Sequence, residues 1–375
     1  MSSPIPIFLP RSKSIVIRCL IVNYLRTGTL LPVFENDPND IKLVYNALKI
    51  IDARKKNAVS EECVIDVEDC GAAYRFLMAM LAITPGKWLL TGTPRLLERP
   101  ILPLVNFLNA NGANIQKGTQ GWHIEGCNLH IENIDSIETE ETSQFASAIL
   151  MINSPHTAHR SPLTAPYLQM TKTIMQLNEF LPLLKLADWS AAAFWLANAL
   201  LKPDTYYLLK DLHFDNLQGD AEIVTWFEQF GLYFSENELG IEVKQSNRIE
   251  IPKQKIDVTN TPDIAMILAT LAVCYPFELT LSGLKNLNLK ESNRLDITVN
   301  ELSKFTTILQ HSKEQITIQK RTQQLPETFY FNSYNDHRFV MAWSLFKNFG
   351  SMNIENADCV KKSYPEFLNY YISST

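Results

Sequence analysis

The sequence is poor in glycine and cysteine, and both shortages narrow what it can encode. Glycine occurs 13 times in 375 residues, about half its usual share, and no collagen-like or Gly/Ser-linker segment is present. The six cysteines are scattered without a CxxC pair, which argues against a disulfide framework or a zinc cluster. His156 and His159 are closely spaced, but no Cys or carboxylate joins them locally, so we predict a surface loop, no metal and no cofactor.

Long apolar runs and a net positive charge are also missing. No uninterrupted apolar stretch reaches ~18 residues, and the first residues lack the basic region and cleavage site of a signal peptide. We therefore expect a cytoplasmic protein with reduced thiols and no membrane partner. Lys+Arg total 34 against 40 Asp+Glu, a net charge of -6, which argues against a nucleic-acid binder but leaves room for a local basic pocket.

The chain contains enough apolar residues to form large cores, and it contains an internal repeat. Hydrophobic residues make up 46% and charged residues 20%, and the length suggests two or three domains. The segment Ile65–Gly92 aligns without a gap on Ile256–Gly283 at an offset of 191 residues. Both segments predict a strand, a polar turn, an apolar helix and a second strand, so the chain resembles two similar halves.

Six segments open in the same way, with a short polar cluster before a helix that is apolar on most of its faces. The clusters are Arg11–Ser14, Asp69–Gly71, Glu141–Gln144, Asp188–Ser190, Thr261–Asp263 and Asn335–Arg338. Such helices are buried, and Ser, Thr, Asp and Asn before a helix are ordinary N-caps. Several clusters also carry Lys, Arg, Gln or His, and a helix N-terminus attracts phosphate and carboxylate groups. The pattern thus favours either simple capping or sites for a polyanionic substrate.

A series of motifs follows in the order found in the enolpyruvyl transferase family, and the resemblance covers nearly the whole chain. The matching segments are Leu9–Arg18 (PGSKSxxxR), Gly71–Arg75 (GTAMR), Leu90–Gly92 with Glu98–Ile101 (LTG and ERPI), Thr142–Gln144 (SSQ), Pro166–Tyr167 (PY), Asp188–Ala192, Pro262–Met266 (PDxAM), Lys290–Arg294 (KExxR), Asn335–Arg338 (NDHR) and Lys362–Pro365 (Lys, Ser or Thr, Phe or Tyr, Pro).

The resemblance implies an α/β fold, a two-domain inverted α/β barrel in which each domain holds three βαβαββ units. We expect one domain over residues 11–186, holding the first three units and the shikimate-3-phosphate side. Residues 1–10 and 187–375 would form the second domain, with the catalytic carboxylates and much of the phosphoenolpyruvate site. By analogy with the family we expect a monomer.

The resemblance also implies an activity in chorismate and aromatic amino-acid biosynthesis, the transfer of the enolpyruvyl group of phosphoenolpyruvate to the 5-hydroxyl of shikimate-3-phosphate with release of phosphate. It implies that shikimate-3-phosphate is bound by Lys13, Ser14, Arg18, Thr142, Ser143, Gln144, Thr164, Asp263, Asn286 and Lys290. It implies that phosphoenolpyruvate is bound by Lys13, Gly71, Arg99, Gln144, Arg294, Arg338 and Lys362. Arginine suits such anions because its planar fork binds carboxylate or phosphate through two hydrogen bonds.

Three residues would carry the chemistry by the same resemblance. Asp263 would accept the proton of the hydroxyl, Glu291 would protonate the methylene carbon, and Lys13 would lie between both substrates. The alternative for Asp263 is a helix cap, and for Glu291 an i, i+3 ion pair with Arg294.

The sequence also departs from the family pattern. Arg11 replaces a glycine, and Asp69-Cys70-Gly71-Ala72 stands where NAGT is usual, so that an acid would lie near phosphoenolpyruvate unless it is protonated or paired with Arg11 or Lys13. Two alternatives therefore stay open. One is a weakened or inactive homologue that binds a phosphorylated ligand. The other is a UDP-N-acetylglucosamine enolpyruvyl transferase, which the absence of a cysteine around Thr84–Arg99 disfavours.

Overall fold

The computed structural model describes residues 3–56, 61–129, 131, 137, 142–153, 165–202, 204–245 and 249–373. The chain forms two compact units. Met1–Arg11 and Lys185–Thr375 make up one, which we call the split unit, and Ser12–Leu184 make up the other, the inserted unit. Among the described residues, no helix combines the length and the apolar character that crossing a membrane requires.

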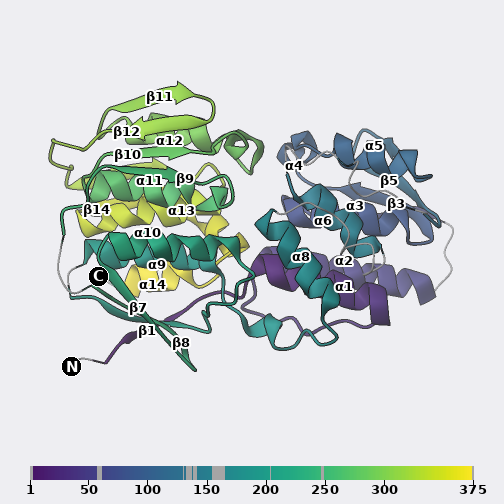
Figure 1. Cartoon of the computed structure of the whole chain (residues 1–375). Coiled ribbons are helices and arrows are strands. Elements are labelled where there is room, and N and C mark those ends of the chain that lie inside the picture. Colours follow the sequence, from purple (N-terminus) through teal and green to yellow (C-terminus); the bar gives the residue numbers. More distant parts are fainter. Residues whose placement is uncertain are drawn as a thin grey trace. The chain divides into compact units, whose positions relative to one another are not determined.

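The inserted unit contains one four-stranded sheet with helices packed against it (Figure 1). The sheet order is β2-β3-β5-β4. Its helices are α1 (Lys13–Thr27), α2 (Asn39–Lys56), α3 (Gly71–Ala82), α4 (Pro94–Glu98), α5 (Leu102–Ala110), α6 (Gln144–Ile152) and α8 (Pro166–Gln176), and its strands are β2 (Cys63–Asp66), β3 (Gly86–Thr91), β4 (Asn114–Lys117) and β5 (Trp122–Gly126). The short 3-10 helix η2 (Leu183–Lys185) lies where this unit ends.

The split unit contains three sheets, with orders β1-β6-β8-β7, β11-β12-β10-β9 and β13-β14. Its strands are β1 (Ile5–Phe8), β6 (Tyr206–Lys210), β7 (Leu232–Asn237), β8 (Gly240–Gln245), β9 (Gln254–Asp257), β10 (Leu279–Ser282), β11 (Ile308–Ser312), β12 (Gln315–Ile318), β13 (Thr328–Asn332) and β14 (Ser351–Glu355). Its α-helices are α9 (Trp189–Leu201), α10 (Ile223–Gln229), α11 (Ala265–Cys274), α12 (Arg294–Leu302), α13 (His337–Trp343) and α14 (Phe367–Ser373). Its 3-10 helices are η3 (Gly219–Glu222), η4 (Pro262–Ile264), η5 (Leu287–Leu289), η6 (Ser344–Asn348) and η7 (Ala357–Lys362).

The predicted repeat is present as two equivalent βαβ segments. Strands β2 and β3 pair in parallel with Ile65 opposite Leu90, and β9 and β10 pair in parallel with Ile256 opposite Leu281. Both partners of the second pair follow those of the first by the same 191 residues, so the register repeats as well as the sequence. Each segment is followed by an antiparallel hairpin that joins the second strand, which completes the same four-stranded pattern twice.

The six helices predicted after polar clusters are all present and buried. They are α1, α3, α6, α9, α11 and α13. In the split unit, α11 packs against both α9 and α13, and Figure 1 shows these helices as a layer between the sheet of β10–β12 and the sheet of β1, β7 and β8. The α/β fold class with repeated βαβ units is therefore confirmed.

The first strand joins the split unit from a distance in sequence. Ile5 in β1 pairs in parallel with Tyr207 in β6, and Ile7 pairs with Leu209, while the whole inserted unit separates the two strands along the chain. Ile7 is 2% exposed and belongs to the core of the split unit. The sheet β1-β6-β8-β7 thus repeats the pattern of the other two four-stranded sheets, with its first strand supplied by the start of the chain.

Candidate active site

Arg294 is the centre of a group of charged side chains in the split unit. It is the first residue of α12, and its side chain is 1% exposed. Its Nη1 donates to Asp263 at 2.8 Å and its Nη2 to Glu291 at 2.9 Å. Asp336 accepts from Nε at 2.8 Å and from Nη2 at 3.2 Å. Burial would lower the pKa of Arg294, but these three carboxylates outweigh burial and raise it.

Asp263 contacts three cationic side chains, those of Arg294, Arg338 and Lys290. It belongs to η4, directly before α11, and about a quarter of its side chain is exposed. Besides Arg294, Arg338 Nη2 lies 3.2 Å from Oδ2 and Lys290 Nζ lies 3.6 Å from Oδ1. Burial would raise the pKa of this carboxyl, but the charges of Lys290, Arg338 and Arg294 together hold the pKa well below its usual range.

Glu291 has a cation on each carboxylate oxygen. Oε2 accepts from Arg294, and Oε1 lies 3.5 Å from Lys362 Nζ. Lys362 comes from the end of η7, about seventy residues later in the chain, and only 8% of its side chain is exposed. The i, i+3 ion pair that the sequence left open for Glu291 is therefore present, and it is one edge of a larger network. We call Asp263, Lys290, Glu291, Arg294, Asp336, Arg338 and Lys362 the charge cluster.

Asp336 anchors the charge cluster to the start of α13. Its carboxylate caps its own helix by accepting from the backbone N–H of Arg338 at 3.0 Å. It also accepts from the Ser292 hydroxyl at 2.9 Å, and it is fully buried. Sequence reasoning placed Asp336 in a motif but gave it no role. The signal was available, because an acid directly before a buried helix is both a cap and a partner for nearby cations.

A buried acid outside every predicted motif adjoins the charge cluster. Asp220 in η3 is 2% exposed and accepts a short hydrogen bond from the Ser190 hydroxyl in the first turn of α9. Burial and the nearby charge of Asp263 raise the pKa of Asp220 to about 7, although Ser190 and Arg338 oppose the rise. Its carboxyl group thus changes protonation near neutral pH, next to the groups proposed to move protons.

Arg18 organises a second polar group, in the inserted unit. Its guanidinium is 2% exposed, donates from Nε to the Thr171 hydroxyl at 2.7 Å and from Nη1 to the Ser14 carbonyl at 2.8 Å. Nη2 lies 3.5 Å from the Ser147 hydroxyl, and the ring of Phe76 lies 4.9 Å away. Burial lowers the pKa of Arg18 to about 10. Ser147 follows Gln144 by one turn of α6, a spacing that the sequence already displayed.

Lys13 is held by an acid that sequence reasoning did not consider. Its Nζ lies 2.9 Å from Asp40 Oδ2, and Asp40 in α2 is 3% exposed. The sequence offered Lys13 as a possible partner of Asp69, and the structure gives Lys13 a close ion pair with Asp40. The ammonium group at the start of α1 is therefore fixed by a neighbouring helix.

Two further arginines are positioned at the start of α3. Arg75 donates to the Gln144 side chain at 2.8 Å and to the Pro100 carbonyl at 3.1 Å, so it braces a predicted substrate ligand. The Arg99 guanidinium lies directly over Gly71, where an added Cβ would meet Nη1 at 2.6 Å. Only a glycine at this position leaves room for Arg99 as it stands.

The remaining described site residues lie at the starts of α6 and η5. Thr142 Oγ1 accepts from the backbone N–H of Gln144 at 3.2 Å, and Ser143 is the residue before α6. Asn286 precedes η5, four residues before Lys290. Thr164 lies outside the described residues. The structure thus joins the six predicted residues of the split unit's cluster, and it joins those of the inserted unit in smaller groups around Lys13, Arg18, Arg75 and Arg99.

The chemistry of these groups suits anions. The charge cluster holds four cations against three carboxylates, and within the described parts of the chain no three His, Cys, Asp or Glu side chains gather as metal ligands do. The charge cluster can therefore bind carboxylate or phosphate groups and exchange protons through Asp263 and Glu291.

Comparison with known proteins identifies the family of the chain. The model of the family described as EPSP synthase (3-phosphoshikimate 1-carboxyvinyltransferase) matches residues 40–180 and 185–370. A 3-phosphoshikimate 1-carboxyvinyltransferase of Bacteroides fragilis is 29% identical over 96% of this chain and 92% of its own length. A protein of the same name from Aliivibrio fischeri is 26% identical over 96% of this chain and 94% of its own length.

A solved structure of EPSP synthase from Acinetobacter baumannii superposes with a TM-score of 0.67 at 18% identity, covering 99% of this chain and 95% of that one. That likeness extends the agreement to the fold over the whole chain. With the family model matched over most of its length, the chain belongs to the EPSP synthase family of enolpyruvyl transferases.

Proposed function

We propose that this protein transfers the enolpyruvyl group of phosphoenolpyruvate to the 5-hydroxyl of shikimate-3-phosphate and releases phosphate. The single observation that supports this most strongly is the charge cluster, in which two acids capable of proton transfer share four cations. The family membership and the names of the relatives in Bacteroides and Aliivibrio support the same substrates.

The proposed reaction is an addition followed by an elimination. Asp263 accepts the proton of the hydroxyl as its oxygen attacks C2 of phosphoenolpyruvate, and Glu291 donates a proton to the C3 methylene. A tetrahedral intermediate results. Glu291 then takes a proton back from C3 while the C–O bond to phosphate breaks. Asp263 passes the hydroxyl proton to the departing phosphate, so the enolpyruvyl ether and hydrogen phosphate leave and both acids return to their starting states. Arg294, Arg338 and Lys362 would offset the negative charge that gathers on phosphate and carboxylate.

The ion pairs of the charge cluster explain how Asp263 and Glu291 gain the ability to exchange protons when substrates bind. A carboxylate with a depressed pKa is a weak base, and Asp263 has this low pKa while Lys290 and Arg338 contact it. Substrate phosphate and carboxylate groups compete for the same two cations. Binding of the anionic substrates therefore raises the basicity of Asp263 at the moment when a hydroxyl is present to be deprotonated.

The same argument applies to Glu291. A donor role needs a proton on one carboxylate oxygen, and Lys362 Nζ stands 3.5 Å from Oε1. When the phosphoenolpyruvate carboxylate takes Lys362, this oxygen becomes available for the proton. We assign these acids and their cations to the split unit's part in catalysis, and Lys13, Ser14, Arg18, Thr142, Ser143 and Gln144 to the inserted unit's part in holding shikimate-3-phosphate.

A coupled phosphate-release assay tests the proposal. We expect release with phosphoenolpyruvate and shikimate-3-phosphate, and none when UDP-N-acetylglucosamine replaces shikimate-3-phosphate. Asp263→Asn keeps the shape of the side chain and should lower kcat by about 10²–10⁴-fold with little change in substrate binding. No release by the wild-type protein, or a full rate in the variant, would contradict the proposed reaction or the role of Asp263, respectively.

A further inference from the structure

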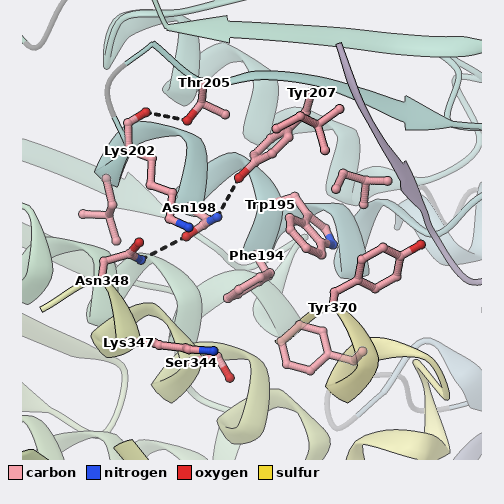
Figure 2. Close-up of a pocket in the computed structure, with 14 residues that line it drawn as sticks. Phe194, Trp195, Asn198, Lys202, Thr205, Tyr207, Ser344, Lys347, Asn348 and Tyr370 are labelled. Carbon is pink, nitrogen blue, oxygen red and sulfur yellow. Dashed lines mark hydrogen bonds between the residues drawn. The ribbon is translucent and has the colours of Figure 1, made fainter. Parts of the chain in front are cut away.

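A pocket that shares no lining residue with the charge cluster lies within the split unit. It has a volume of about 840 Å³ and is lined by residues of β1, β6, α9, η6 and α14 (Figure 2). Sites for small molecules usually measure about 300–1,000 Å³. Helix α9 carries Ser190, which contacts Asp220, in its first turn, and it lines the pocket from Phe194 in its second turn to Leu201 at its end.

One side of the pocket is a rigid aromatic wall. The Trp195 ring lies edge-on to Tyr207 at 5.6 Å and to Tyr370 at 5.5 Å between centroids, and Phe194 lies edge-on to Phe367 at 4.9 Å. The Tyr207 hydroxyl accepts a hydrogen bond from the Asn198 amide at 2.8 Å, which fixes this ring. These rings give the pocket an apolar aromatic surface, against which a planar apolar group can pack.

The other side is polar and positively charged. In the view of Figure 2, Lys202, Lys347, Asn198 and Asn348 lie to the left of the rings of Trp195 and Tyr370. Asn348 donates to Asn198 at 2.9 Å, so the two amides form a fixed pair between the lysines. Among the described residues that line the pocket there are two lysines and neither Asp nor Glu.

The positive charges of Lys202 and Lys347 repel each other. Burial and the charge of Lys202 lower the pKa of Lys347. Like charges at a partly buried surface repel more strongly than in bulk water, because water screens them less there. An anion that contacts both would relieve this repulsion and gain charge-assisted hydrogen bonds.

We propose that this pocket binds a small aromatic carboxylate, with its ring against Trp195 and Tyr370 and its carboxylate between Lys202 and Lys347. The aromatic side and the cationic side together define this ligand class, since neither a sugar phosphate nor a neutral apolar molecule would use both. The inference does not depend on the proposed enzymatic reaction.

Binding of 2-naphthoate, measured by isothermal titration calorimetry, tests the proposal. We expect saturable binding of one molecule per chain, accompanied by quenching of tryptophan fluorescence. Lys202→Met and Lys347→Met keep the length of the side chain and remove its charge, and each should weaken binding about tenfold or more, the loss of one charge-assisted hydrogen bond. The neutral analogue 2-naphthalenemethanol should bind the wild-type protein at least about tenfold more weakly for the same reason.

The matched control is Lys253→Met, which removes an exposed lysine of the same unit outside the pocket. It should bind 2-naphthoate as the wild type does. Because anions also suit the charge cluster, the lysine variants decide the location: equal affinity in wild type, Lys202→Met and Lys347→Met would overturn the proposal. Absence of saturable binding, or equal affinity for the neutral analogue, would overturn it as well.

Discussion

Substitution of Gly71 by alanine should displace Arg99 and thereby weaken the use of phosphoenolpyruvate. An added Cβ would lie 2.6 Å from Arg99 Nη1 and 2.7 Å from its Cζ and Nη2, whereas ordinary contact begins at 3.4 Å. The guanidinium must therefore move by roughly 0.8 Å, and a misplacement of about 1 Å can reduce a rate by about 10²-fold. We expect kcat/KM for phosphoenolpyruvate to fall by about 10–100-fold.

Stability should respond differently from activity in this variant. The atom that must move is the far end of a flexible side chain, and Gly71 begins helix α3 without a positive φ. Alanine at such a position stabilises a protein by about 0.4–1 kcal/mol through the unfolded state. The midpoint of thermal unfolding should therefore stay level or rise slightly while activity falls.

A double-mutant cycle with Arg99→Met isolates the clash. Methionine removes the guanidinium and bends around the new methyl group, so Gly71→Ala should cost little further activity in the Arg99→Met background. The measurement is the coupled phosphate-release rate against phosphoenolpyruvate concentration for all four proteins. If Gly71→Ala lowers kcat/KM by the same factor in both backgrounds, the reasoning from this contact is refuted.

Three further substitutions test other parts of the network. Asp336→Asn leaves a buried guanidinium short of a carboxylate and should lower the free energy of unfolding by about 3 kcal/mol in urea denaturation at pH 7; a loss below about 1 kcal/mol would contradict the anchoring role. The pKa of Asp220 is raised from 3.8 to about 7 in the folded protein, so its contribution to stability is complete below pH 4 and is lost as pH rises through 7; Asp220→Asn should flatten the stability profile in this window, and an unchanged profile would oppose this assignment. Asp40→Asn should release Lys13 and weaken shikimate-3-phosphate binding about tenfold by calorimetry, whereas Asp52→Asn, which breaks an exposed ion pair on the same helix, should leave binding unchanged.

Sequence reasoning was most successful where structure depends on local order. The repeat at a fixed offset predicted equivalent strands, because β-sheet register follows the alternation of apolar side chains along each strand. The polar clusters predicted the starts of the buried helices, because N-caps lie within a few residues of the groups they bind. Glu291 and Arg294 are three residues apart, so their ion pair could also be anticipated, although Glu291 lies just before α12 rather than within it.

The residues that sequence reasoning missed are those whose partners are distant along the chain. Asp220 meets Ser190 across 30 residues, and Thr171 meets Arg18 across 153. Asp40 looks like any acid in the first turn of a helix until α2 packs beside α1 and brings it to Lys13. Only the tertiary packing of helices makes these contacts, and no spacing within a single element encodes them.

During synthesis on the ribosome, strand β1 is made long before the strand with which it pairs. Strand β1 emerges near the beginning, but its partner β6 follows only after the entire inserted unit. At about 5–20 residues per second, the interval is ~10–40 s. The inserted unit is continuous in sequence and can fold during this time. Strand β1 therefore stays without its sheet partner until the whole inserted unit has been made, and the sheet β1-β6-β8-β7 joins a segment made before that unit to three strands made after it.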